Sequence, residues 1–232
     1  MRIAVISFSG NVGKTTIARH LISPRIPNAA ILSVESANAD EGEADALKGK
    51  QFALLQEALQ VEDNLIVDIG ASNIEDLLAG MEKYQGSHKD FDYFVVPTVS
   101  DIKQQRDTAN TVEKLASIGV APDRIRIVLN RVDQGTPTEE QFSMLQIFLS
   151  NNKVCGFDVN CALTENEVYQ LVNHDSRSLR ELADDTTDFK GLIAKAATRQ
   201  EKLDIAQGLA IKRLATGVLP ELDACFKALA LQ

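Results

Sequence analysis

The chain has 232 residues, and its 44% hydrophobic and 25% charged residues are typical of a globular protein rather than a disordered or fibrous one. A net charge of −9, from 24 Lys and Arg against 33 Asp and Glu, disfavours unassisted, non-specific binding to nucleic acid or to an anionic membrane. Three cysteines without C-x-x-C spacing argue against a disulfide framework or a zinc site, and no apolar run approaches the roughly 20 residues of a membrane span, so we expect a cytoplasmic protein.

Short runs rich in Val and Ile alternate with longer amphipathic stretches, which is the pattern of parallel strands covered by helices on both faces. The predicted strands are Arg2 to Ser7, Ala30 to Glu35, Asn64 to Ile69, Tyr93 to Pro97, Arg126 to Asn130 and Val154 to Val159. The predicted helices are Thr15 to Leu21, Asp45 to Leu59, Asn73 to Tyr84, Asp101 to Ile118 and Glu139 to Leu149. We therefore predict an α/β fold with a doubly wound, mainly parallel sheet.

The last of these predicted helices has a start signal. Thr136 with Glu139 three residues later predicts a capping box, and Pro137 would occupy the first helical position. The helical spacing of the apolar residues that follow predicts a core-facing stripe, made of Phe142, Leu145, Phe148 and Leu149.

From about Thr164 onward, helical patterns replace the strand signal. After Pro220 the apolar residues recur at helical spacing, at Leu222, Cys225, Phe226 and Leu229. No linker-like stretch separates this part from the rest. Residues 164–232 are therefore expected to form a helical C-terminal cap packed on the same sheet, within a single domain of residues 1–232.

The strongest motif follows the first predicted strand and precedes a helical run, the context that a phosphate-binding loop requires. Gly13 would let the backbone pass close to phosphate, Lys14 would bridge terminal phosphates, and Thr15 would offer a hydroxyl to Mg²⁺. The strict pattern G-x-x-x-x-G-K-[ST] fails at its first glycine, which is Phe8 here. The predicted nucleotide-binding residues of the loop are Ser9, Gly10, Asn11, Val12, Gly13, Lys14, Thr15 and Thr16.

A second signal is a hydrophobic strand that ends in Asp68. An acid at the carboxyl edge of a parallel sheet is where Mg²⁺ would be held through water, so Thr15 and Asp68 are the predicted metal residues. Gly70 begins a small-residue turn whose amides could approach the γ-phosphate. Lys14 and Asp68 are also candidate catalytic residues.

The loop and this strand resemble those of the deviant-Walker-A P-loop ATPases, the family that includes the ParA plasmid-partition proteins and MinD. The loop is similar to the family's K-G-G-x-G-K-T-T, and the resemblance runs from Met1 to about Leu182. The stretch from Asp68 to Ala71 resembles the family's Walker B and second switch. The strand around Asn130 resembles the one whose Asn contacts adenine in that family. Within the family, the stretches 9–15 and 34–40 look most like StbB-type plasmid-stability proteins.

The chain departs from the family at the signature lysine, which reaches across an ATP-sandwich dimer and would sit at Ser9 here. The family's second glycine likewise falls at Asn11. A hydroxyl cannot neutralise phosphate charge as an ammonium does, so family-style dimerisation and hydrolysis are both in question. Another cation could substitute, the candidates being Arg19, Lys103 and Arg106.

Two acids after the second strand are further candidates. The family resemblance implies that an acid near this point positions the attacking water, and Glu35 or Asp40 could do so, or Glu35 could help to hold Mg²⁺. The alternative is a solvated acidic loop.

The segment from Asn130 to Asp133 also fits the guanine-specificity pattern N-[KR]-x-D, in which the Asp carboxylate accepts hydrogen bonds from guanine. Asn130, Arg131 and Asp133 are thus predicted base-side residues. The family resemblance favours ATP, and the tetrapeptide keeps GTP open.

A basic stretch lies near the C-terminus. Residues 189–213 hold six basic side chains against two acidic ones, which favours either a solvated helix face or a DNA- or partner-facing stripe.

These signals together predict a ParA/MinD-like nucleotide switch that binds ATP with Mg²⁺ and acts in plasmid stability, partition or intracellular positioning. ATP hydrolysis would be slow or partner-dependent. The expected partner is a plasmid-encoded DNA-binding adaptor, with weak or no direct DNA binding, and the protein would be a monomer or a nucleotide-dependent homodimer. The alternatives are a small-molecule kinase or ligase on the same fold, and a non-hydrolysing, nucleotide-dependent adaptor.

Overall fold

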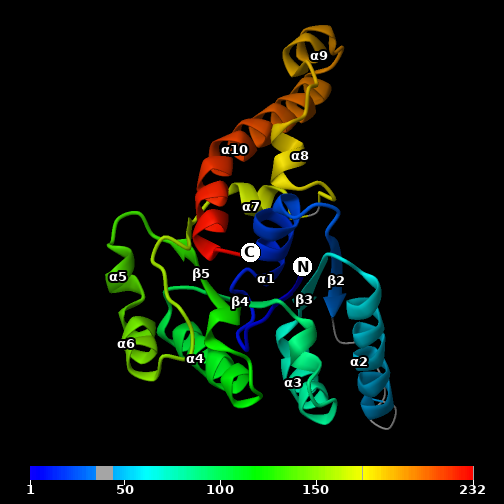
Figure 1. The fold of residues 1–232 in the computed structure, drawn as a ribbon. Coiled ribbons are helices and arrows are strands. Elements are labelled where there is room, and N and C mark those ends of the chain that lie inside the picture. The colour runs from blue at the N-terminus through cyan, green and yellow to red at the C-terminus, as the bar shows by residue number, and fades with distance from the viewer. Residues whose placement is uncertain (35–43, 174, 232) are drawn as a thin grey trace.

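The computed structural model describes residues 1–34, 44–173 and 175–231, and it contains one six-stranded sheet in which every neighbouring pair is parallel. The strand order is β2-β3-β1-β4-β5-β6 (Figure 1). The strands are β1 (Arg2–Val5), β2 (Ala30–Val34), β3 (Leu65–Ile69), β4 (Tyr93–Thr98), β5 (Ile125–Val132) and β6 (Ala162–Thr164). The predicted parallel α/β architecture is confirmed.

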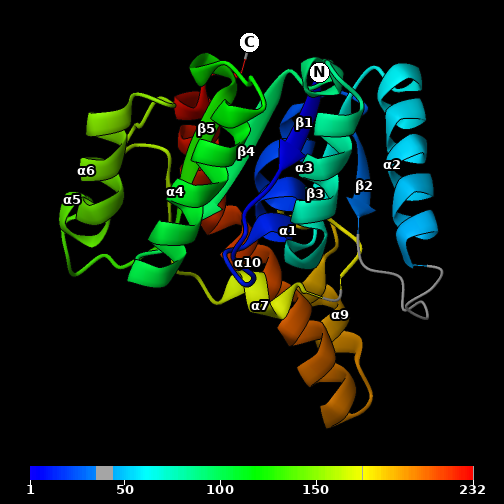
Figure 2. The same cartoon turned by 90° about the horizontal axis from the view of Figure 1, so that it is seen from below.

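Helices cover both faces of the sheet, as Figures 1 and 2 show. One face packs on α2 (Ala44–Val61), α3 (Ile74–Lys83), α4 (Ile102–Ser117) and α6 (Ser143–Asn152). The other packs on α1 (Lys14–Thr16), its π-helical continuation η1 (Ile17–Ile22), α7 (Val168–Leu171), α8 (Leu179–Ala183) and α10 (Arg199–Leu229). The short helices α5 (Thr138–Gln141) and α9 (Phe189–Lys195) complete the set.

The alternation of side chains along β1 supplies both cores. Ala4 and Ile6 point into the first face, while Ile3 and Val5 point into the second, and all four are fully buried. β1 lies between β3 and β4, so the chain winds outward from it in both directions. The carboxyl ends of strands on the two sides of such a switch point form the usual ligand crevice of a doubly wound sheet.

Two predictions of local structure are wrong. The sixth strand is Ala162–Thr164 rather than Val154 to Val159, because Asp158 forms a turn in which it accepts from the amides of Asn160 and Cys161.

The predicted capping box at Thr136 does not form either. Its hydroxyl donates to Asp133 at 3.2 Å, and Pro137, not Thr136, is the residue before α5. The helix is also interrupted at Phe142, which separates α5 from α6. The predicted apolar stripe does face the core, since Phe142, Leu145 and Leu149 are buried.

The C-terminal helices form the predicted cap on one face of the sheet. α10 is 31 residues long and includes Pro220 in its interior. Its second half buries an i, i+3, i+7 stripe of Leu222, Cys225 and Leu229 against the sheet. Across the described ranges, no helix combines the length and apolar character needed to cross a bilayer.

The two halves of α10 should respond differently to the same truncation. Leu222→Ala removes a fully buried side chain and is expected to lower the free energy of unfolding by about 2 to 5 kcal/mol. Leu203→Ala, at a side chain 51% exposed near the start of the helix, should change it by less than about 0.5 kcal/mol. Urea denaturation of both variants measures the difference, and equal losses would contradict the packing described.

Candidate nucleotide-binding site

The loop between β1 and α1 is held against the end of β5 by one buried side chain. Asn130, which is 3% exposed, donates from Nδ2 to the carbonyl of Val12 at 2.9 Å. Gly13 lies beside this amide with φ +89°, and a Cβ at Gly13 would stand 2.2 Å from Asn130 Nδ2. Glycine is therefore required at this position both for its backbone conformation and for the close approach of β5.

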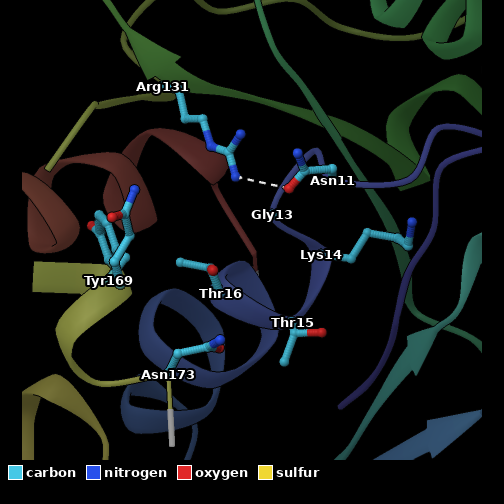
Figure 3. A pocket seen from close by; sticks show the side chains of 9 residues that line it. Asn11, Gly13, Lys14, Thr15, Thr16, Arg131, Tyr169 and Asn173 are labelled. Carbon is cyan, nitrogen blue, oxygen red and sulfur yellow. Dashed lines mark hydrogen bonds between the residues drawn. The ribbon is translucent and has the colours of Figure 1, made fainter. Parts of the chain in front are cut away.

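Asn11 and Arg131 form a second link across the loop. Both have positive φ, of 57° and 52°, and Arg131 Nη2 donates to Asn11 Oδ1 at 3.1 Å (Figure 3). Left-handed conformation is uncommon for such residues and tends to mark functional loops. Both side chains border the cavity beside the loop.

Lys14 is folded back onto the loop. Its Nζ donates to the carbonyls of Ser9 at 2.8 Å and Ser7 at 3.3 Å, and the residue is only 8% exposed. Burial lowers the pKa of this ammonium below its usual value, and the charge of Asp68 opposes that shift. An anion at the loop would offer the buried ammonium a charged partner in place of two carbonyls.

Thr15 and Asp68 meet at the edge of the sheet. The Thr15 hydroxyl donates to Asp68 Oδ2 at 2.6 Å, and Asp68 is 7% exposed at the end of β3. The part of the chain that the structure describes contains no cluster of three or more His, Cys, Asp or Glu that could hold a metal ion. A hydroxyl and one carboxylate fit Mg²⁺, which keeps several waters and takes further oxygens from phosphates.

A cavity of about 510 Å³ opens beside the loop (Figure 3). The loop, the start of α1 and Arg131 line one side, and Tyr169, Gln170 and Asn173 line the other. A smaller recess of about 50 Å³ continues toward Glu165 and Asn166, in the connection between β6 and α7. The volume of the main cavity is in the range of small-molecule sites.

Tyr169, Gln170 and Asn173 form the side of the cavity that we call the α7 wall, and none of them is among the predicted site residues. The strand before it has only three residues, too short to stand out as an apolar run. The order of strands could have revealed this wall, because the connection after a parallel strand lies at the same edge of the sheet as the loop after β1.

Ser9, at the position of the missing lysine, has a carboxylate partner. Its hydroxyl donates to Asp107 Oδ2 of α4 at 2.5 Å, and the residue is 5% exposed. Of the three candidate substitute cations, Lys103 and Arg106 are exposed on α4, and Arg19 donates to the carbonyl of Asp175. The Ser9 hydroxyl thus faces an acid, Asp107, while the Ser9 carbonyl accepts from Lys14.

The remaining predicted residues lie as follows. Gly10 is exposed in the loop, and Thr16 borders both cavities. The amide of Gly70 donates to the carbonyl of Val34 at 2.9 Å. Asp133 lines neither cavity; its carboxylate accepts from Thr136 in its own turn. Glu35 and Asp40 lie outside the described residues.

No family model matches the chain, and no curated protein matches it. Solved structures share its fold. Apo McdA from Cyanothece gives a TM-score of 0.55 at 13% identity, covering 90% of this chain and 98% of that one. A McdA variant from Cyanothece in complex with ATP gives 0.52 at 17% identity, covering 94% and 96%. MinD from Pyrococcus horikoshii with Mg-ADP gives 0.51 at 14% identity, covering 94% and 95%.

At these identities the likeness shows the fold alone. The chain has the α/β fold of the McdA and MinD P-loop ATPases, with a six-stranded parallel sheet and a long C-terminal helix. The predicted resemblance is confirmed at this level.

Gly13→Ala should destabilise the protein because it adds a Cβ at positive φ against Asn130. We expect a loss of about 1 to 3 kcal/mol in the free energy of unfolding without nucleotide. Gly10→Ala is the matched control, since a Cβ there meets nothing within 4 Å and its φ lies outside the left-handed region. Urea midpoints compare the two variants, and equal stability would refute the close approach.

Proposed function

We propose that this chain is a nucleotide-binding switch of the ParA/MinD type that takes ATP with Mg²⁺. The observation that supports this most directly is the Thr15 hydroxyl lying 2.6 Å from the Asp68 carboxylate, next to the buried ammonium of Lys14. In this proposal the amides at the start of α1 and Lys14 hold the phosphates, while Thr15 and Asp68 hold the metal ion. The metal would supply charge neutralisation at the phosphates when bound.

The base is proposed to be adenine, bound in the cavity between Arg131 and the α7 wall. Guanine recognition through N-[KR]-x-D needs the Asp carboxylate in the base site, whereas Asp133 accepts from Thr136 outside both cavities. One N–H of Asn130 Nδ2 donates to the Val12 carbonyl, so its second N–H and its side-chain oxygen would be the groups available to a base. The McdA variant structure holds ATP, and the Pyrococcus horikoshii MinD structure holds Mg-ADP.

Hydrolysis is proposed to be slow or to depend on a partner. The Ser9 hydroxyl donates to Asp107, so this position offers no positive charge to a triphosphate. Charge that builds up on phosphates during hydrolysis then lacks one stabilising cation. The same contact favours a second candidate, an adaptor that binds nucleotide and partner proteins without turnover. Steady-state phosphate release, with and without partners, separates the two.

The biological role is proposed to be plasmid stability, partition or intracellular positioning, with a DNA-binding protein as partner. The resemblance of stretches 9–15 and 34–40 to StbB-type proteins supports the plasmid role. The net charge of −9 supports recruitment to DNA through a partner rather than by the chain itself.

ATP with Mg²⁺ should raise the thermal stability of the protein. At 100 times the dissociation constant the expected gain is about 2.7 kcal/mol, because the ligand binds only the folded state. Lys14→Ala should remove most of this gain, while Lys83→Ala, at an exposed lysine of α3, should retain it. Differential scanning fluorimetry measures both. If neither ATP nor GTP at millimolar concentration stabilises the wild type, the proposed function is wrong.

Base preference has its own test. Asp133→Asn should leave ATP affinity within about twofold, because the carboxylate lines neither cavity. If Asp133→Asn loses nucleotide affinity and the wild type prefers GTP, the bound base is guanine and not adenine. Titration calorimetry with both nucleotides distinguishes these outcomes.

A further inference from the structure

A helical arm projects from the body of the molecule (Figures 1 and 2). It consists of residues 189–213, which form α9, a short turn and the first half of α10. None of these residues is buried. Phe189 packs at Gly208, where a Cβ would stand 2.9 Å from its ring, so the two helices of the arm hold each other. Ile211, at the base of the arm, packs partly buried against one core, and the rest of the arm extends beyond both hydrophobic cores.

The tip of the arm combines apolar and basic side chains. Leu192 is 46% exposed and Leu203 is 51% exposed, on either side of the turn between the two helices. Lys195, Arg199 and Lys202 are exposed in the same segment and form no ion pair with another described residue. The arm carries a net charge of +4, whereas the rest of the chain carries −13.

A surface of opposite character lies on α2. Leu54 and Val61 are 54% and 78% exposed, and they are seven residues apart, so they share one face of the helix about 10 Å apart. The flanking acids Glu57 and Glu62 are exposed and form no ion pair with a described residue. This face is therefore apolar with an acidic rim.

We propose that the tip of the arm of one molecule docks on the α2 face of a second copy of this chain. The exposed leucines of the tip would cover Leu54 and Val61, and the three cations would meet Glu57 and Glu62. Figures 1 and 2 place the arm and α2 on different sides of the molecule, so the contact forms between copies. The two patches differ, which makes the interface heterologous and allows either a closed ring or an open chain.

The composition of the tip favours a protein surface over other acidic partners. A DNA duplex would pair with the cations but offers nothing apolar to the two leucines. A bilayer would accept leucines, but the other large apolar residues of the arm, such as Ile193 and Leu209, are partly covered within it, which leaves too narrow an apolar face for stable insertion. The α2 face satisfies both the leucines and the cations.

The docking does not involve the nucleotide cavity. None of the residues at the tip or on the α2 face lines that cavity. Self-association through the arm should therefore occur without nucleotide, unlike a dimer that closes over two triphosphates. Its strength should fall with added salt, because the paired charges at the rim are exposed and screened.

Sedimentation velocity of the nucleotide-free protein across a concentration series tests the proposal. The wild type should self-associate, and Lys195→Glu with Lys202→Glu should weaken that association by at least about tenfold. Leu192→Ser with Leu203→Ser should do the same. Two controls should leave it unchanged: Lys103→Glu with Lys227→Glu, which alters net charge equally outside both surfaces, and Ile147→Ser, at a side chain 63% exposed on α6.

A charge exchange makes the test specific to this pair of surfaces. Glu57→Lys with Glu62→Lys should also yield monomers. Mixing this variant with the Lys195→Glu, Lys202→Glu variant should restore a mixed complex, because the unaltered tip of the first then meets the unaltered face of the second, and the altered tip and altered face are also complementary. Circular dichroism checks that all variants are folded.

A wild type that stays monomeric at every concentration would overturn the proposal, and so would association that the arm variants leave intact. Failure of the exchanged pair to associate would equally contradict it. The same variants are tested against a short DNA duplex and against phosphatidylcholine–phosphatidylglycerol vesicles. If the arm binds the duplex or the vesicles and the protein does not self-associate, the partner of the arm is DNA or a membrane and not a second copy of the chain.

Discussion

The site depends on the close contact between the loop after β1 and the end of β5. Asn130 reaches across from β5 to bind the Val12 carbonyl, and this is possible only because Gly13 has no side chain to meet it. The contact fixes the left-handed turn that aims the following amides at the cavity. Because β1 and β5 lie in the same sheet, one buried hydrogen bond couples the geometry of the loop after β1 to that of the end of β5.

The C-terminal part of the chain builds the site as well as covering the sheet. His20, buried behind the loop, has its pKa lowered to about 4 by burial and so stays neutral, which lets Nδ1 accept from the amide of Leu179 at the start of α8. Arg25 donates to the carbonyls of His20 and Leu21 and also to Asp223 of α10. The helix that carries the phosphate-binding loop is thereby fixed to α8 and α10 at its far end.

The sequence predicted best those features that depend on a short, continuous stretch of residues. The strand-loop-helix context identified the loop, and Val- and Ile-rich runs located five of the six strands, because buried parallel strands must be continuously apolar. The sixth strand was misplaced, since it is only three residues long and its register with β5 shifts between Leu129 and Val132. The Ser9–Asp107 contact joins residues 98 apart in sequence, so no local pattern could reveal it.

The two halves of α10 have different physical roles. The carbonyl of Leu229 accepts from Arg126 of β5, and Asp223 accepts from both Arg25 and Arg180, so its second half is fixed to the sheet and to the loop helix. Tyr169 lines the cavity beside the loop. Burial raises the pKa of its hydroxyl, and the nearby Glu221 and Cys225 of α10 raise it further. In the first half, the partly buried Ile211 and Leu214 pack against the core, and the residues before them project past it (Figure 1). One continuous helix therefore joins the part of the molecule beside Tyr169 to the projecting arm.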